Sequence, residues 1–166
     1  MAKKARDQLD LFAAPAPAPS PVVPPATEAL DVPAETTALA GALDPLIHLG
    51  TSSWTFPGWA GLCYPRGTTE AQLMSQGLAL YSRWPLFRTV GIDRSYYRPI
   101  PRDELAAYAA QLPPGFRCIE KVWDGVTAAT FPDHAKHGAR AGKPNERFLD
   151  PSLFLEGVWA PHVGTF

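Results

Sequence analysis

Two polar side chains that are suited to chemistry lie at the ends of the second and third of three short apolar runs. Asp93 comes directly after the second run, and Lys121 lies in the last part of the third. A lysine shielded from water can act as a base or nucleophile, and a nearby carboxylate can orient it or move protons. We predict Asp93 and Lys121 as catalytic residues. The alternative is a structural ion pair at the ends of two strands.

A ligand beside that pair would need a surface to rest on. Trp54 and Tyr97 offer aromatic faces on which a sugar or a base can stack, and Ser52 adds a hydroxyl group. We predict these three as substrate-binding residues. The alternative is that the two aromatic side chains pack the rim of the domain and contact no ligand.

The elements that must position these residues alternate between strands and helices. Each apolar run has the length of a buried strand, and segments with helical periodicity separate the runs. Thr69 is a typical helix N-cap. Strands that alternate with helices pair in parallel through right-handed crossovers. The predicted order is strand 46–51, helix 70–83, strand 86–92, helix 104–112 and strand 116–123.

Residues 124–150 are predicted to form a long polar loop. Its histidines, His134 and His137, are expected to be solvated. Two histidines alone are too few for a metal site, which needs three or four converging ligands. We therefore predict no metal site, and the cofactor, if one is used, is unknown from the sequence. The basic residues of the loop are expected to be solvated, with contact to nucleic-acid phosphates as the alternative. Beyond the loop we predict a helix with its body at 153–159, and the start of a fourth strand at 162–166.

Composition divides the chain at about residue 45. Residues 1–45 contain Phe12 as their single aromatic and many alanines and prolines, so they are predicted to be a disordered tail. The formal net charge of −1 points to neither a nucleic-acid binder nor a membrane-surface protein. No apolar run approaches the ~20 residues that cross a bilayer, and no hydrophobic signal core follows the basic N-terminus. We expect a cytoplasmic protein with no membrane contact.

The tail carries a short linear motif at residues 8–12. Gln8, Leu9, Asp10, Leu11 and Phe12 match, at all five positions, the motif with which proteins bind the bacterial sliding clamp of DNA replication. A location near a terminus, before a Pro-rich spacer, is typical of peptide ligands. We predict the clamp as a partner. The alternatives are that the segment packs on the domain or has no role.

Residues 49–123 resemble the opening of the domain-of-unknown-function 72 family, also called YecE-like. The resemblance rests on the segment Leu49–Gly61, on Tyr64-Pro65, and on the runs Thr89–Tyr97 and Phe116–Lys121. It implies a TIM-like barrel of about twice this core's length, with no established activity. Members commonly carry a glutamate and an asparagine where this chain has Gly91 and Asp93, so a site that needs that glutamate is not implied here.

The resulting fold prediction is α/β: a partial TIM-like barrel of three to four βα units at residues 46–166, after the tail at 1–45. A small complete sheet of three or four strands is the alternative. Self-association through the open sheet edge is expected. For function, we weigh a DNA-metabolism protein brought to the clamp by its tail against a small-molecule barrel enzyme acting on a sugar or phosphorylated compound. As an enzyme it would be a hydrolase or lyase. An inactive truncated remnant is the third alternative.

Overall fold

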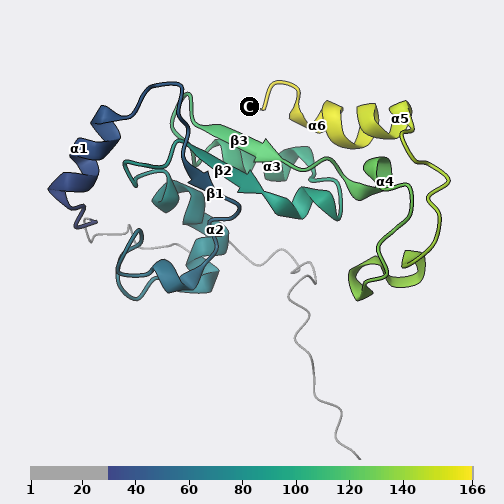
Figure 1. The fold of residues 1–166 in the computed structure, drawn as a ribbon, viewed down its shortest axis with the longest axis horizontal. Helices are drawn as coiled ribbons and strands as arrows, with labels where there is room; N and C mark the ends of the chain where they lie inside the picture. Colours follow the sequence, from purple (N-terminus) through teal and green to yellow (C-terminus); the bar gives the residue numbers. More distant parts are fainter. Residues whose placement is uncertain (1–29, 166) are drawn as a thin grey trace, which may run out of the picture.

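The computed structural model describes residues 30–165, which centre on a small parallel sheet. Strands β1 (Gly50–Thr51), β2 (Thr89–Ile92) and β3 (Arg117–Glu120) lie side by side in that order (Figure 1). In the register, Thr51 faces Val90, and Ile92 faces Glu120. The predicted parallel pairing is therefore confirmed. All three strands point the same way, so their carboxyl ends form one edge.

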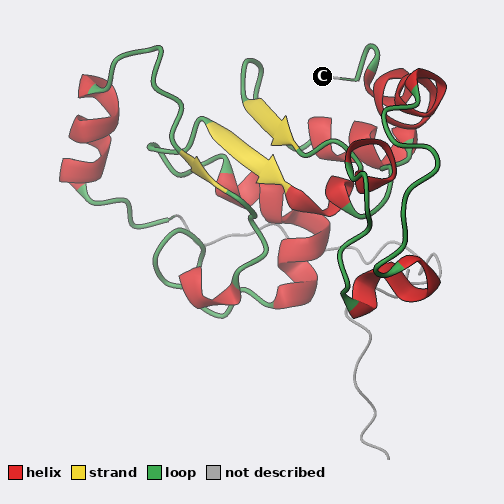
Figure 2. Cartoon of the chain, turned by 45° about the vertical axis from the view of Figure 1, so that its right-hand side comes forward, coloured by secondary structure: helices red, strands yellow, loops and turns green. Residues whose placement is uncertain are grey.

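Two helices cover one face of this sheet. Helix α2 (Glu70–Tyr81) connects β1 to β2, and α3 (Arg102–Ala109) connects β2 to β3 (Figure 2). Val90 and Ile92, two residues apart on β2, lie on the same face and share one buried cluster with side chains of both helices. Ile119 alternates to the other face and is 65% exposed. The core therefore lies between the sheet and α2 and α3, and the other face is open at β3.

Local sequence signals explain how α2 begins. Thr69 accepts a hydrogen bond from the Gln72 N–H, and the Gln72 side chain accepts one from the Thr69 N–H, which completes a capping box. Near the end of the helix, the Tyr81 hydroxyl accepts from the Thr51 N–H at 2.8 Å and donates to the Thr89 carbonyl at 3.1 Å. This buried tyrosine ties α2 to β1 and β2.

The first strand is shorter than predicted. Residues 46–48 lie outside the strand, because Asp44 forms a turn with the Ile47 N–H at 2.9 Å, and pairing begins at the Leu49 carbonyl, which accepts from the Arg88 and Thr89 N–H groups. Leu46 is 86% exposed at this edge. The Arg88 side chain donates to the Asp44 carbonyl at 3.3 Å and to the Ala40 carbonyl at 2.8 Å, so these two carbonyls bond a side chain rather than a neighbouring strand.

Residues 1–45 were predicted to be disordered, and this prediction is wrong for helix α1 (Ala34–Ala42), which the same arginine contacts. Ala40 is buried, and its carbonyl is the acceptor for Arg88. Composition missed this helix because one arginine 48 residues away in sequence holds its C-terminal half. The domain boundary at residue 46 stays a prediction.

The segment after β3 is also more ordered than the predicted polar loop. It contains α4 (Asp124–Thr127) and η3 (Ala135–Arg140), then α5 (Pro151–Phe154), η4 (Leu155–Trp159) and α6 (Ala160–His162) in close succession. The helix predicted at 153–159 is confirmed, and Asp150 caps its start, accepting from the Ser152 N–H at 2.9 Å. The predicted fourth strand is wrong at residues 162–165: α6 ends at His162, and the Thr165 N–H closes a turn onto the His162 carbonyl at 3.0 Å.

Candidate functional site

The predicted pair Asp93 and Lys121 meets at the carboxyl edge of the sheet. Because Ile92 faces Glu120 in the register, the residues that follow them are neighbours. Lys121 Nζ lies 3.1 Å from Asp93 Oδ1. The two side chains are 58% and 44% exposed, so water reaches both groups. The Lys121 ammonium is therefore open to a ligand from solvent, whereas a base or nucleophile would require a lysine shielded from water.

A buried serine fixes the backbone beneath this pair. Ser95 is 5% exposed. Its hydroxyl donates to the Ile92 carbonyl at 2.6 Å and to the Lys121 carbonyl at 2.8 Å, in a hydrogen bond shared between the two acceptors. It thereby connects the turn after β2 to the end of β3. Ser95 was not among the predicted site residues. Its position two residues beyond Asp93 was the one sequence signal that could have indicated its role.

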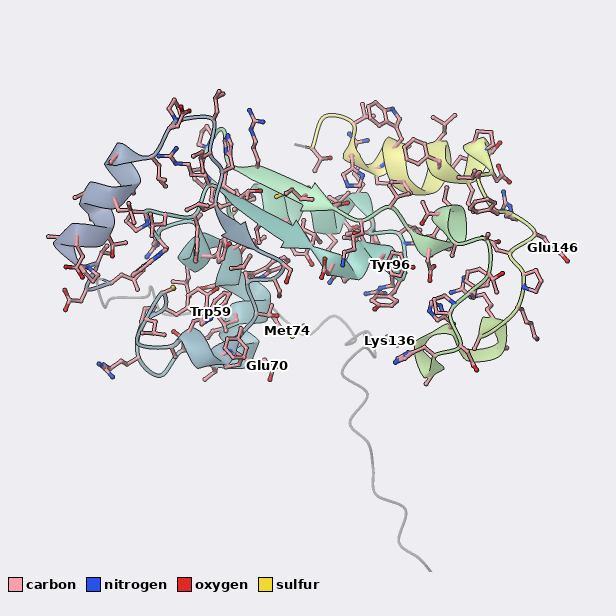
Figure 3. The ribbon with its side chains drawn as sticks, in the orientation of Figure 1. Trp59, Glu70, Met74, Tyr96, Lys136 and Glu146 are labelled. Atoms are coloured by element: carbon pink, nitrogen blue, oxygen red, sulfur yellow. The ribbon has the colours of Figure 1, made fainter. Side chains whose placement is uncertain are left out.

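Tyr97 stands at the end of the same turn, η2 (Asp93–Tyr96), and is 38% exposed. The Lys136 ammonium lies 4.5 Å from the centroid of its ring, within the range of a cation–π contact. Figure 3 labels Tyr96, which packs edge-on against Tyr97, and Lys136 on η3 at the same end of the molecule. Tyr97 thus has the partial exposure that a stacking surface requires.

The structure places Trp54 in the core rather than at this surface. The residue is 7% exposed, and its ring packs edge-on against Tyr108 with centroids 5.3 Å apart. The Tyr64 hydroxyl donates to the Trp54 carbonyl at 2.6 Å. The indole therefore presents no open face to a ligand. The sequence pattern could not distinguish this location from a rim position, because both follow a strand end.

Ser52 is exposed and lies against β2. A Cβ atom added at Gly91 would stand 2.9 Å from the Ser52 Cα, so the two backbones approach as closely as only a glycine allows. This contact gives Gly91 a structural role. The glutamate common at this position in the resembling family could not be placed here without a shift of the Ser52 backbone.

A buried ionisable pair lies behind this surface and was not predicted. His137 Nδ1 is 3.1 Å from Asp124 Oδ2, and the two side chains are 3% and 0% exposed. The prediction of a solvated His137 is therefore wrong. Phe131 is also buried, with its ring centroid 6.0 Å from that of His137. This aromatic residue inside a polar stretch was the one sequence signal that the segment packs.

Most of the described chain matches one known protein family. A family model described as Protein of unknown function DUF72 matches residues 48–161. The chain belongs to this family. No curated protein and no solved structure matches it. The match extends the predicted resemblance from residue 123 through α4, η3 and α5 into α6, so the segment after β3 belongs to the DUF72 region as well.

Other features of this DUF72 chain concern metal ligands, membrane helices and cavities. Within residues 30–165, no group of three or more His, Cys, Asp or Glu side chains is placed to hold a metal ion. None of the helices described there is long and apolar enough to cross a membrane. A cavity of about 400 Å³ runs along β3, with Phe116, Cys118, Glu120 and His162 among its lining residues. The predicted clamp-binding residues, Gln8 to Phe12, lie outside the described part of the chain.

Proposed function

We propose that the carboxyl edge of the sheet binds a small phosphorylated or sugar ligand, as part of an enzyme of the hydrolase or lyase class. The observation that carries this proposal is the Lys121–Asp93 pair at 3.1 Å beside the half-exposed Tyr97 ring. In parallel α/β sheets, ligands bind outside the carboxyl ends of the strands. Fold alone does not select a reaction, so the argument rests on these side chains.

The chemistry of the three groups suits such a ligand. The Lys121 ammonium can neutralise a phosphate, and Asp93 limits the directions in which the ammonium points. Tyr97 can stack a sugar ring or a base on its open side. Ser52 can donate a hydrogen bond to a ligand hydroxyl from the neighbouring strand. Asp93 and Lys121 serve in binding first, and a catalytic role for them stays a prediction.

A thermal-shift screen tests this proposal. The full chain is heated with a panel of sugar phosphates, nucleotides and the matching unphosphorylated sugars. A ligand at ten times its Kd stabilises the folded state by about 1.4 kcal/mol, or several degrees in Tm. Lys121→Met should remove the shift, and Lys143→Met, a lysine in an exposed position of the loop, should keep it. A shift that survives Lys121→Met would contradict the proposal, and no shift with any compound would favour an inactive chain.

For the fold, we propose that the sheet is part of a larger (β/α) barrel. Three parallel strands in sequential order, with α2 and α3 on one face, support this proposal. The exposed Ile119 lies on the face that would become the barrel interior. In this chain alone, we propose that the edge of β3 pairs with a second copy. Sedimentation velocity should then show a dimer that Ile119→Lys weakens and that Leu155→Lys, at another exposed apolar residue, leaves intact; a monomer at all concentrations would contradict it.

A second candidate function rests on the match at all five positions of residues 8–12. The tail would bring the domain to the bacterial sliding clamp, and so to DNA metabolism, without a basic surface. Leu9, Leu11 and Phe12 would each gain ~1.5–3 kcal/mol if fully buried. The cost of ordering the tail leaves an affinity of roughly micromolar order.

Fluorescence anisotropy of a labelled peptide spanning residues 1–18 tests this second function. Titration with bacterial sliding clamp should give saturable micromolar binding, which the Leu11→Ala/Phe12→Ala peptide should lose. Equal binding by both peptides, or none well above micromolar concentration, would assign the match to chance.

A further inference from the structure

A fully buried carboxylate lies beyond the end of β3 without an aligned hydrogen bond. Asp124 pairs with His137 at 3.1 Å, yet neither of its carboxylate oxygens receives a hydrogen bond of good geometry. Buried ion pairs contribute little net stability compared with apolar residues of similar volume. What such a pair does provide is a fixed position for the two segments that it joins.

Those segments are the end of β3 and the loop at residues 129–145. Asp124 is the first residue of α4, and His137 lies in η3. The loop is closed by the Phe131 N–H, which donates to the Lys143 carbonyl at 3.0 Å. At its far end, the Asn145 side-chain amide donates to the Gly125 carbonyl at 2.9 Å. Loop and α4 therefore form one ordered unit with the Asp124–His137 pair inside it.

The residue that precedes His137 is the one that reaches the candidate site. Lys136 has its ammonium 4.5 Å from the Tyr97 ring centroid, and the His137 ring centroid is 6.3 Å from that of Tyr97. The Lys136 N–H donates to His134 Nδ1 at 3.1 Å, and the next residue, His137, pairs with the buried Asp124, so the position of Lys136 depends on both contacts. Lys121 lies three residues before Asp124, and Lys136 directly precedes His137.

We propose that Asp124 and His137 are positioning residues of the candidate site, which hold the loop so that Lys136 completes an anion-binding face with Lys121 and Tyr97. This inference rests on the proposed ligand site and specifies its ligand: the group bound at this edge is anionic, a phosphate in particular. Asp124 and His137 themselves do not touch the ligand, because both side chains are buried.

Two measurements on the full chain test the inference. Amide hydrogen exchange reports loop order at Phe131 and Asn145, with the β2 amides as an internal measure of global folding. Asp124→Asn should accelerate exchange at the two loop amides at least tenfold and leave β2 unchanged. Asp133→Asn, an exposed acid in the same loop, should change neither. If Asp124→Asn also loosens β2, His137→Gln is measured in the same way.

The second measurement is titration with inorganic phosphate, followed by NMR. Lys136→Met and Asp124→Asn should each weaken phosphate binding several-fold, and the double variant should be no weaker than either alone, because both act through the same ammonium. Unchanged loop exchange in Asp124→Asn and His137→Gln would overturn the inference, and so would full phosphate affinity in a variant with a loosened loop. If Lys121→Met does not affect phosphate binding, the proposed function fails, and the exchange rates still decide the positioning role.

Discussion

The Ser95 hydroxyl donates to the carbonyl of Lys121 across 2.8 Å, from the turn after one strand to the end of the next. Both ends of this hydrogen bond adjoin the ionic pair, since Asp93 lies two residues before Ser95. The exposed pair is screened by water and contributes little to stability, so it cannot fix its own geometry. The buried serine fixes it, and the carboxyl edge is rigid beneath a solvated surface.

Replacing this serine should therefore destabilise the domain. Ser95→Ala leaves a buried carbonyl without its donor, and we expect a loss of about 1–3 kcal/mol in the free energy of unfolding. Urea unfolding at neutral pH measures the change. Ser75→Ala is the matched control, because that hydroxyl also donates to backbone carbonyls but on an exposed part of α2. Equal effects from the two substitutions would contradict this account of Ser95.

Tyr81 should be essential for docking the first strand. Tyr81→Phe removes a buried hydroxyl that serves the Thr51 N–H and the Thr89 carbonyl, so we expect a loss of about 1–3 kcal/mol. Hydrogen exchange at Thr51 should accelerate more than exchange in β3. Tyr96→Phe provides the control, because among residues 30–165 no hydrogen bond involves the Tyr96 hydroxyl. Exchange at Thr51 that is unaffected by Tyr81→Phe would refute the role of this hydroxyl.

Stability should decline in alkaline solution. Burial raises the pKa of the Cys118 thiol from 9.0 to about 11. Between these values the unfolded chain has lost the proton that the folded chain keeps, so stability is complete below pH 9 and falls as the pH rises towards 11. Burial also raises the pKa of the Tyr64 and Tyr108 hydroxyls, with the same sign above pH 10.

Urea unfolding at a series of pH values tests this dependence. Cys118→Ala should make the decline between pH 9 and pH 10 shallower, and the remaining slope should steepen as the tyrosines begin to ionise. Stability that stays constant or increases between pH 9 and pH 10.5 in the natural chain would contradict it.

Local signals in the sequence were sufficient for the scaffold. The Thr69 cap and the helical spacing of apolar residues predicted α2. The alternation of strands and helices predicted that neighbouring strands pair in parallel. That topology was enough to bring Asp93 and Lys121 together, because adjacent parallel strands end at the same edge. These predictions depend on short-range patterns and on one general rule of topology.

Features that depend on distant contacts could not be predicted in the same way. Helix α1 is held by Arg88, and His137 is buried by a partner in α4, so neither follows from its own neighbourhood. Trp54 occupied a strand-end position typical of a binding residue, yet the closely packed Tyr108 places it in the core. The predicted fourth strand failed at residues 162–165 for a related reason: the His162 side chain bonds the Glu120 side chain at 2.7 Å, and helix α6 ends at His162.

The central claim is that the carboxyl edge of the sheet is the ligand site. The most direct measurement is NMR chemical-shift mapping of the isotopically labelled chain during titration with a sugar phosphate. We expect saturable shifts at Ser52, in the turn from Asp93 to Tyr97, and at Lys121 and Lys136. Saturable shifts confined to the cavity along β3, or no saturable shifts at any residue, would contradict the claim.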